Sequence, residues 1–201
     1  MLDTAAALLL LWPGKRKPDI RAIIERAALA GSIQSYRAGQ VAAASTIARL
    51  SKEIGTDLEL VGLPIPRGEL AKRALAGAEH FADAFRDGMA DKREVADQFG
   101  PRAAAKQVAE DEAYRLRRLA ATENSVAFNE ARQSEVEASV KRAGVDPKTV
   151  TRIWHAELDA CEKCNVLNGD EAALNGSFPS GEEPGAVHAN CRCTTEFRYD
   201  G

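Results

Sequence analysis

Aromatic residues and cysteines are both scarce in this 201-residue chain, and each shortage narrows the range of folds. Aromatics make up 5% of the residues while the hydrophobic fraction is 45%. This balance favours helices packed through alanine and other small side chains over a thick β-core. The length suffices for one ordinary domain, or for a helical domain with a small subdomain. We therefore expect a mainly α protein.

Long apolar runs and an excess of one charge are also missing. The opening run Ala5–Trp12 is too short to cross a bilayer. The basic residues Lys15, Arg16 and Lys17 follow this run, whereas a signal peptide carries them in front of it. With 27 basic and 30 acidic residues the net charge is −3, so the whole chain shows no general preference for nucleic acid. We expect a protein of a reducing cytosol that binds no membrane.

The first hundred residues are predicted to form a helical N-terminal region. Apolar spacing indicates a helix over 19–30 that Gly31 ends, a second that ends at Gly55, and a third over 69–88 that Gly77 weakens. A long helix is predicted over 101–144, because Pro101 is tolerated in a first turn and neither Gly nor Pro follows before Gly144. It would reach about 60 Å. A split over 122–125, where helix propensity is weakest, stays open.

From residue 145 the pattern changes, and residues 145–201 are predicted to form a small β subdomain. Thr149–Trp154 and Thr194–Tyr199 are rich in β-branched residues and alternate in polarity, as strands do. A two-stranded hairpin is only marginally stable alone. All four cysteines lie between the two strands, where a bound metal would supply folding free energy.

Two short clusters of metal-ligand residues predict a structural zinc ion as the cofactor. A C-x-x-C pair followed by H-x-x-C-x-C is typical of a tetrahedral structural zinc site, and a reducing cytosol disfavours disulfides. The candidates are Cys161, Cys164, His188, Cys191 and Cys193. Five candidates exceed the four places, so Cys191 and Cys193 compete for the last one, and His155 is a further candidate.

The long helix carries a carboxylate where its apolar stripe needs a hydrophobic residue. Steps of three or four residues place Glu123 on that stripe, so its charge must reach solvent or find a partner. We predict a structural pairing of Glu123 and its neighbour Thr122 with Arg192, whose direction the two flanking cysteines would hold. The same helix carries a basic cluster, Arg115, Arg117 and Arg118. This cluster and Lys15, Arg16 and Lys17 are either solvated faces or contacts to DNA or a partner protein.

Two segments of the chain resemble one protein family. The first comprises Trp154, Asp159-x-Cys161-x-x-Cys164, Leu167-Asn168-Gly169 and His188-x-Asn190-Cys191-Arg192-Cys193. The second comprises Arg118 to Glu123 followed by Ala127-x-Asn129-x-Ala131, in which Thr122-Glu123 matches part of an Arg-Thr-Glu signature. Together they resemble phage head morphogenesis proteins of the Mu F-like minor head protein family. Ala121 departs from the pattern, because the family has arginine there.

The resemblance implies a structural minor capsid protein of a tailed phage or prophage. Such a protein is made in the host cytoplasm, enters the virion at the head or portal vertex, and acts in head assembly and DNA packaging. Its expected partners are the portal protein, the major capsid protein and packaged double-stranded DNA. The family has no settled catalytic activity, so we expect no enzyme.

Three other classes fit the clusters less well. An HNH-like nuclease needs several catalytic histidines around its metal, but His188 is already claimed as a ligand. A cysteine hydrolase needs a free thiolate, which a zinc-bound cysteine does not provide. A zinc-scaffolded nucleic-acid-binding module needs basic residues near the cysteines, and the stretch from Glu157 onward is acidic.

Overall fold

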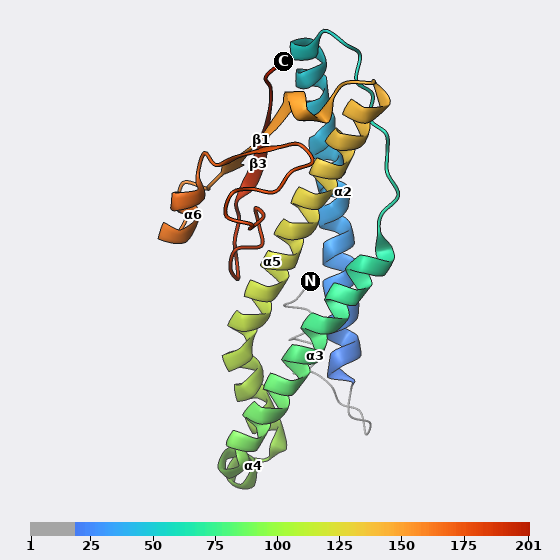
Figure 1. The fold of residues 1–201 in the computed structure, drawn as a ribbon. Coiled ribbons are helices and arrows are strands. Elements are labelled where there is room, and N and C mark those ends of the chain that lie inside the picture. The colour runs from blue at the N-terminus through green and yellow to red at the C-terminus, as the bar shows by residue number, and fades with distance from the viewer. Residues whose placement is uncertain (1–18) are drawn as a thin grey trace. The chain divides into compact units, whose positions relative to one another are not determined.

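A computed structural model describes residues 19–201. The expected mainly α class with a small C-terminal β subdomain is confirmed (Figure 1). The apolar run Ala5–Trp12 and the basic residues Lys15, Arg16 and Lys17 lie outside the described residues. The helices upstream of the sheet are α2 (Ile20–Ile54), α3 (Arg67–Asp91), α4 (Arg93–Phe99) and α5 (Pro101–Arg142).

The predicted break at Gly31 is wrong, because α2 runs without interruption for 35 residues. A glycine inside a helix costs only about 1 kcal/mol relative to alanine. The helix offsets this by burying side chains on both sides of the glycine, including Ile24 and Leu50. Gly39 is required for packing, because a Cβ there would lie 2.2 Å from the carbonyl oxygen of Phe128 on α5.

Helices α3 and α5 are continuous where the sequence left a break open. In α3, Gly77 faces the Leu119 side chain, and a Cβ added to it would lie 3.0 Å from a Leu119 methyl carbon. The long helix α5 has 42 residues and passes through 122–125 without a split. It ends before Gly144, whose φ of 72° suits a residue without a Cβ. The short helix α4 was not predicted.

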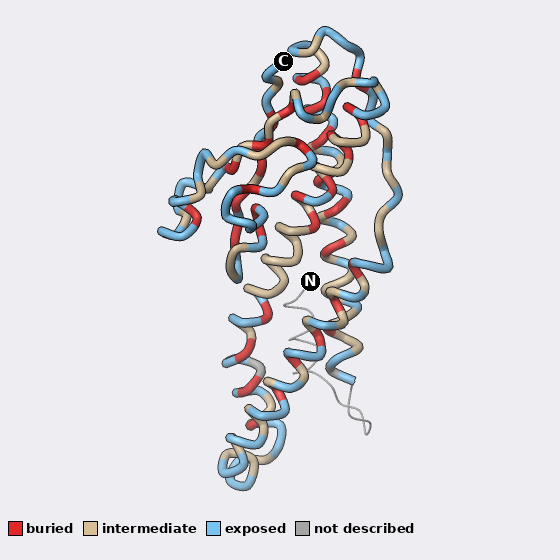
Figure 2. Tube along the Cα trace, viewed as in Figure 1, coloured by how far each residue is buried: buried red, intermediate tan, exposed pale blue. Residues whose placement is uncertain are grey.

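The described chain forms two compact units, each with its own core. The first comprises residues 19–31 and 66–120, and the second comprises 32–65 and 121–201. The core of the first contains Ile24, Ala78, Phe81, Phe85, Val108 and Leu116. That of the second contains Ala43, Ile47, Leu50, Leu58, Val136, Val140, Val150, Leu174 and Phe197. Buried positions in Figure 2 recur at helical spacing along α5.

The second unit contains a three-stranded antiparallel sheet in the order β2-β1-β3. The central strand β1 (Val150–His155) pairs with β3 (Thr194–Tyr199), as predicted, with Arg152 opposite Phe197. On its other edge lies β2 (Glu171–Ala173), which was not predicted because three residues carry little periodic signal. A 3-10 turn, Pro147–Thr149, leads from α5 into β1.

A buried carboxylate holds the irregular connection between α2 and α3. Glu135 on α5 is fully buried. It accepts hydrogen bonds from the backbone N–H groups of Gly62 and Leu63 at 3.0 and 2.6 Å and from the Gln40 side chain at 2.7 Å. Because each carboxylate oxygen has a donor, its burial is compensated.

Candidate metal centre

The first ligand cluster forms around a short helix that the sequence did not predict. Helix α6 (Glu162–Leu167) starts directly after Cys161, which is exposed, and it buries Cys164 on its inner face. The Asn165 N–H donates to the Cys161 carbonyl at 2.9 Å and closes the first turn. A single helical turn therefore brings two thiols three residues apart to one side.

The second cluster lies in the loop that leads into β3. The Cys191 N–H donates to the His188 carbonyl at 3.1 Å, which closes a turn, and Asn190 within this turn has a φ of 68°. Asparagine tolerates this left-handed conformation better than most residues. Cys191 and Cys193 are both buried and point inward.

The five predicted ligands come together in one cluster that can hold a metal ion. Cys164 belongs to two groups of mutually close ligand atoms, one with Cys161 and His188 and the other with Cys191 and Cys193. The Sγ atoms of Cys164 and Cys191 are 3.8 Å apart. A regular tetrahedron with zinc–sulfur bonds of about 2.3 Å has sulfur–sulfur edges of about 3.8 Å.

The His188 ring is oriented with its Nε2 atom toward the thiols. This atom lies 3.2 Å from Cys161 Sγ and 3.0 Å from Cys164 Sγ. The opposite nitrogen, Nδ1, is 3.0 Å from the Ala189 carbonyl oxygen. Because a carbonyl oxygen only accepts hydrogen bonds, Nδ1 carries the proton and Nε2 is left with a lone pair for a metal.

The thiols of the cluster differ in how readily they lose their protons. Burial, followed by the neighbouring thiols of Cys193 and Cys191, raises the pKa of Cys164. Burial also raises the pKa of Cys193, against the opposing effects of the Cys164 and Trp154 side chains. At the exposed end the backbone N–H of Cys164 lowers the pKa of Cys161. A divalent cation must therefore displace protons from the buried thiols, and its charge makes that exchange favourable.

Helix α5 holds the loop of the second cluster by its backbone. The Asn190 N–H donates to Thr122 Oγ1 at 2.6 Å. Asn129 Nδ2 donates to the carbonyls of Cys193 at 3.0 Å and Pro184 at 3.2 Å. Close approach at this point requires Gly185, since a Cβ there would lie 2.9 Å from Ser125 Oγ. Thr122 and Asn129 thus position the backbone that carries three of the candidate ligands.

The predicted pairing of Glu123 with Arg192 is wrong. Arg192 donates instead to Asp159 at 2.5 Å, in an ion pair whose side chains are 55% and 70% exposed. The reason is the alternation of the chain: Cys191 and Cys193 face inward, so the residue between them faces solvent. The Arg192 guanidinium lowers the pKa of Asp159. Glu123 is half-buried on α5. The contact between this helix and the loop of the second cluster is made by the preceding residue, Thr122.

A buried arginine on β1, which was not predicted from the sequence, makes a second set of contacts to α5 and to the loop that contains Glu183. Arg152 on β1 is fully buried. It donates to Gln133 Oε1 at 2.7 Å and Glu183 Oε2 at 2.8 Å, and its guanidinium carbon lies 4.7 Å from the Phe178 ring centre. Its position was detectable, because the alternation of β1 places it on the same face as Val150 and Trp154.

The remaining predicted residues are not members of the cluster, or they precede the described residues 19–201. Arg115 is exposed and bonds to Glu112 on its own helix at 3.0 Å, and the Arg118 guanidinium lies 5.3 Å from the Tyr114 ring centre. Arg117 is exposed on the same helix. His155 is exposed at the end of β1 and, among residues 19–201, is not part of either group of close ligand atoms.

Comparison with protein-family models, with curated proteins and with solved structures gives no match for this chain. The comparisons therefore assign it to no family. Within the described part of the chain, no helix combines the length and the apolar character that crossing a membrane requires.

Proposed function

We propose that this chain is a structural minor head protein of a tailed phage or prophage, with a zinc ion that fastens its C-terminal subdomain. In this role it associates with the portal protein or the major capsid protein during head assembly and DNA packaging. It is made in the host cytoplasm and enters the virion at the head or portal vertex. It performs no catalytic step.

One observation carries the proposal: the two segments that resemble the Mu F-like family contact each other in space. Thr122 belongs to the helical segment and Asn190 to the cysteine-rich segment, and 68 residues separate them in the chain. Asn129 of the helical segment likewise holds the Cys193 carbonyl. Both motifs therefore take part in the same contact between α5 and the cysteine-rich loop. This contact supports treating the resemblance as a single structural feature.

The donor set supports zinc as the metal. Thiolate sulfurs with one imidazole nitrogen are typical of structural zinc sites, whereas magnesium and calcium take oxygen ligands. Four protein ligands fill a tetrahedral shell and leave no position for a substrate. Cys161, Cys164 and His188 would take three places, and Cys191 and Cys193, whose Sγ atoms both lie close to that of Cys164, compete for the fourth.

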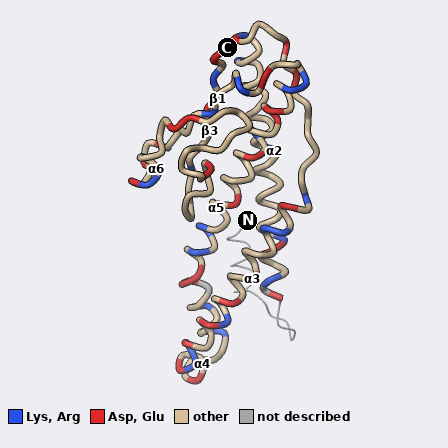
Figure 3. Tube along the Cα trace, viewed as in Figure 1, with Lys and Arg blue, Asp and Glu red and all other residues tan. Residues whose placement is uncertain are grey.

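The nucleic-acid alternatives have less support from the charges around the cluster. Acidic positions gather along the chain on both sides of α6 (Figure 3). Such a surface repels phosphate, which dominates contacts with DNA. If DNA is contacted, the basic residues Arg115, Arg117 and Arg118 on α5 are the better candidates.

Two experiments test the proposal. Elemental analysis of the full chain, purified with a reducing agent, should find about one zinc per chain. A metal-free protein with an intact fold would refute the structural zinc site. The gene order around the coding sequence should place a portal gene directly upstream and a capsid gene downstream. A neighbouring toxin or restriction cassette, together with DNA nicking in magnesium or manganese, would refute the head-protein assignment and favour a nuclease.

A further inference from the structure

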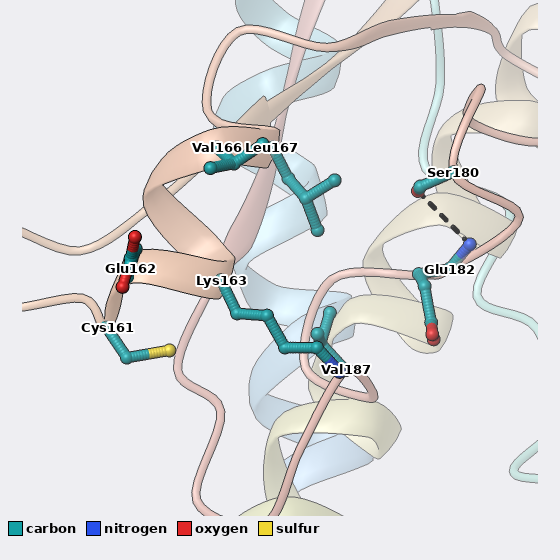
Figure 4. A pocket seen from close by; sticks show the side chains of 8 residues that line it. All are labelled: Cys161, Glu162, Lys163, Val166, Leu167, Ser180, Glu182 and Val187. Carbon is teal, nitrogen blue, oxygen red and sulfur yellow. Dashed lines mark hydrogen bonds between the residues drawn. The ribbon is translucent and has the colours of Figure 1, made fainter.

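A surface groove lies beside the metal centre, between α6 and the loop over 180–187 (Figure 4). Its volume is about 680 Å³. The apolar part of its lining comes from Val166, Leu167 and Val187, and its polar part from Cys161, Glu162, Lys163, Ser180 and Glu182. The Glu182 N–H donates to Ser180 Oγ at 3.2 Å, which shapes the loop side of the groove.

The groove leaves apolar surface uncovered by the described residues. Val166 is 77% exposed although it lines the groove, and Leu158, shortly before α6, is fully exposed. Apolar side chains gathered beside a hollow and flanked by charges are typical of a binding surface. The exposed apolar side chains of the groove therefore favour a ligand with apolar groups.

The charge of the surroundings adds a second requirement. Residues 157–185 contain seven acidic side chains and one basic side chain, Lys163. Glu162 and Glu182 lie in the groove lining itself, one on each side. A ligand with apolar residues next to basic ones would satisfy both the apolar surface and the acidic flanks.

The chain itself contains a segment with this composition. Ala5–Trp12 is an apolar run that ends in tryptophan, a residue favoured at the centres of interfaces. Lys15, Arg16 and Lys17 follow within five residues of Trp12. The composition of this segment, apolar and then basic, complements the apolar lining and acidic flanks of the groove.

We propose that the groove binds residues 5–17 of a second copy of this chain. Exchange of the segment between copies links chains into dimers or larger assemblies. This inference does not depend on the identity of the metal or on the virion assignment.

Photo-cross-linking in the full chain tests the proposal. Val166 is replaced by p-benzoylphenylalanine, and nitrogen-14 and nitrogen-15 copies are mixed, irradiated, digested and analysed by mass spectrometry. The expected product joins residue 166 of one isotopic form to residues 5–17 of the other. The same replacement at Val41, which is 75% exposed on α2, is the control and should not give this product.

A charge exchange then tests the role of the acidic flanks. Glu162→Lys with Glu182→Lys should lower the cross-link yield about tenfold, as for a loss of about 1.4 kcal/mol in binding, and adding Lys15→Glu with Lys17→Glu should restore it. Zinc content is measured for every variant, so that failure of the groove proposal is distinguishable from failure of the metal centre. Cross-links to other peptides or only within one copy, or a yield that ignores the charges, would overturn the proposal.

Discussion

Substitution of Asn129 by alanine should weaken metal binding although this residue touches no metal. Its side-chain amide donates to the backbone carbonyls of Cys193 and Pro184, and both contacts are buried. Alanine provides no donor, and the surrounding packing hinders replacement by water. The segment between these carbonyls carries His188 and Cys191, so loss of the contacts loosens the geometry of two ligands.

The magnitude follows from the two carbonyls that lose their donor. A buried acceptor without a partner costs about 1–3 kcal/mol, so the variant should lose about 2–6 kcal/mol of unfolding free energy in the metal-bound form. If the metal-bound form is destabilised more than the metal-free form, the difference appears as weaker metal binding. Residues that orient ligands typically contribute about 10–100-fold in metal affinity.

Competition for zinc against a coloured chelator at fixed pH measures the effect, with thermal unfolding recorded in parallel. Asn165→Ala is the matched control, since Asn165 is exposed on α6 and also donates to a backbone carbonyl, that of Ala160 at 3.0 Å. The control should bind zinc like the unmodified chain. If Asn129→Ala binds zinc as tightly as the control, the metal site does not depend on its attachment to α5, and the reasoning is wrong.

Four further outcomes are expected. Cys164→Ser should abolish zinc binding and lower the thermal midpoint, because Cys164 belongs to both groups of ligand atoms; a chelator should lower that midpoint in the unmodified chain but not in the variant. Zinc affinity, measured by competition, should fall as pH falls, since burial raises the pKa of Cys164 and protons then compete with the metal. Gly39→Ala should destabilise the chain by about 1–3 kcal/mol through overpacking in a denaturant titration, whereas Gly68→Ala, with nothing within 4 Å, should not. Arg192→Ala should leave zinc content unchanged, and any loss of stability should be largest above about pH 4 and should disappear as the pH falls further, because Arg192 lowers the pKa of Asp159 and only the ionised carboxylate pairs with it.

The helices and two strands were predictable because their signals are local. The spacing of apolar residues indicated α3 and α5, and alternation indicated β1 and β3. The errors came from reading Gly31 as a stop signal and from elements too short to show a period, namely α4, α6 and β2. A glycine ends a helix only when packing on both sides of it does not outweigh its cost.

The candidate metal centre was predictable as a set of residues, but the arrangement of these residues in space was not. Clustered cysteines with a histidine indicate a metal site, because thiolates this close together need a cation or a disulfide. The partner of Arg192 was not predictable in the same way. A carboxylate on an apolar stripe indicates that a partner is needed, but it does not identify which residue of a distant loop comes near.

What the sequence by itself determined is the class of the fold and the five candidate ligands, since both depend on residue types at short spacing. Only the tertiary structure decided that α5 holds the ligand loop through Thr122 and Asn129, that Arg192 faces Asp159, and that Arg152 lies buried in the sheet. These contacts join residues 19 to 68 positions apart, with Arg152 and Gln133 the nearest pair and Thr122 and Asn190 the farthest. Over such separations the packing of α5 against the sheet decides which polar groups meet, and that packing leaves no periodic trace in the chain.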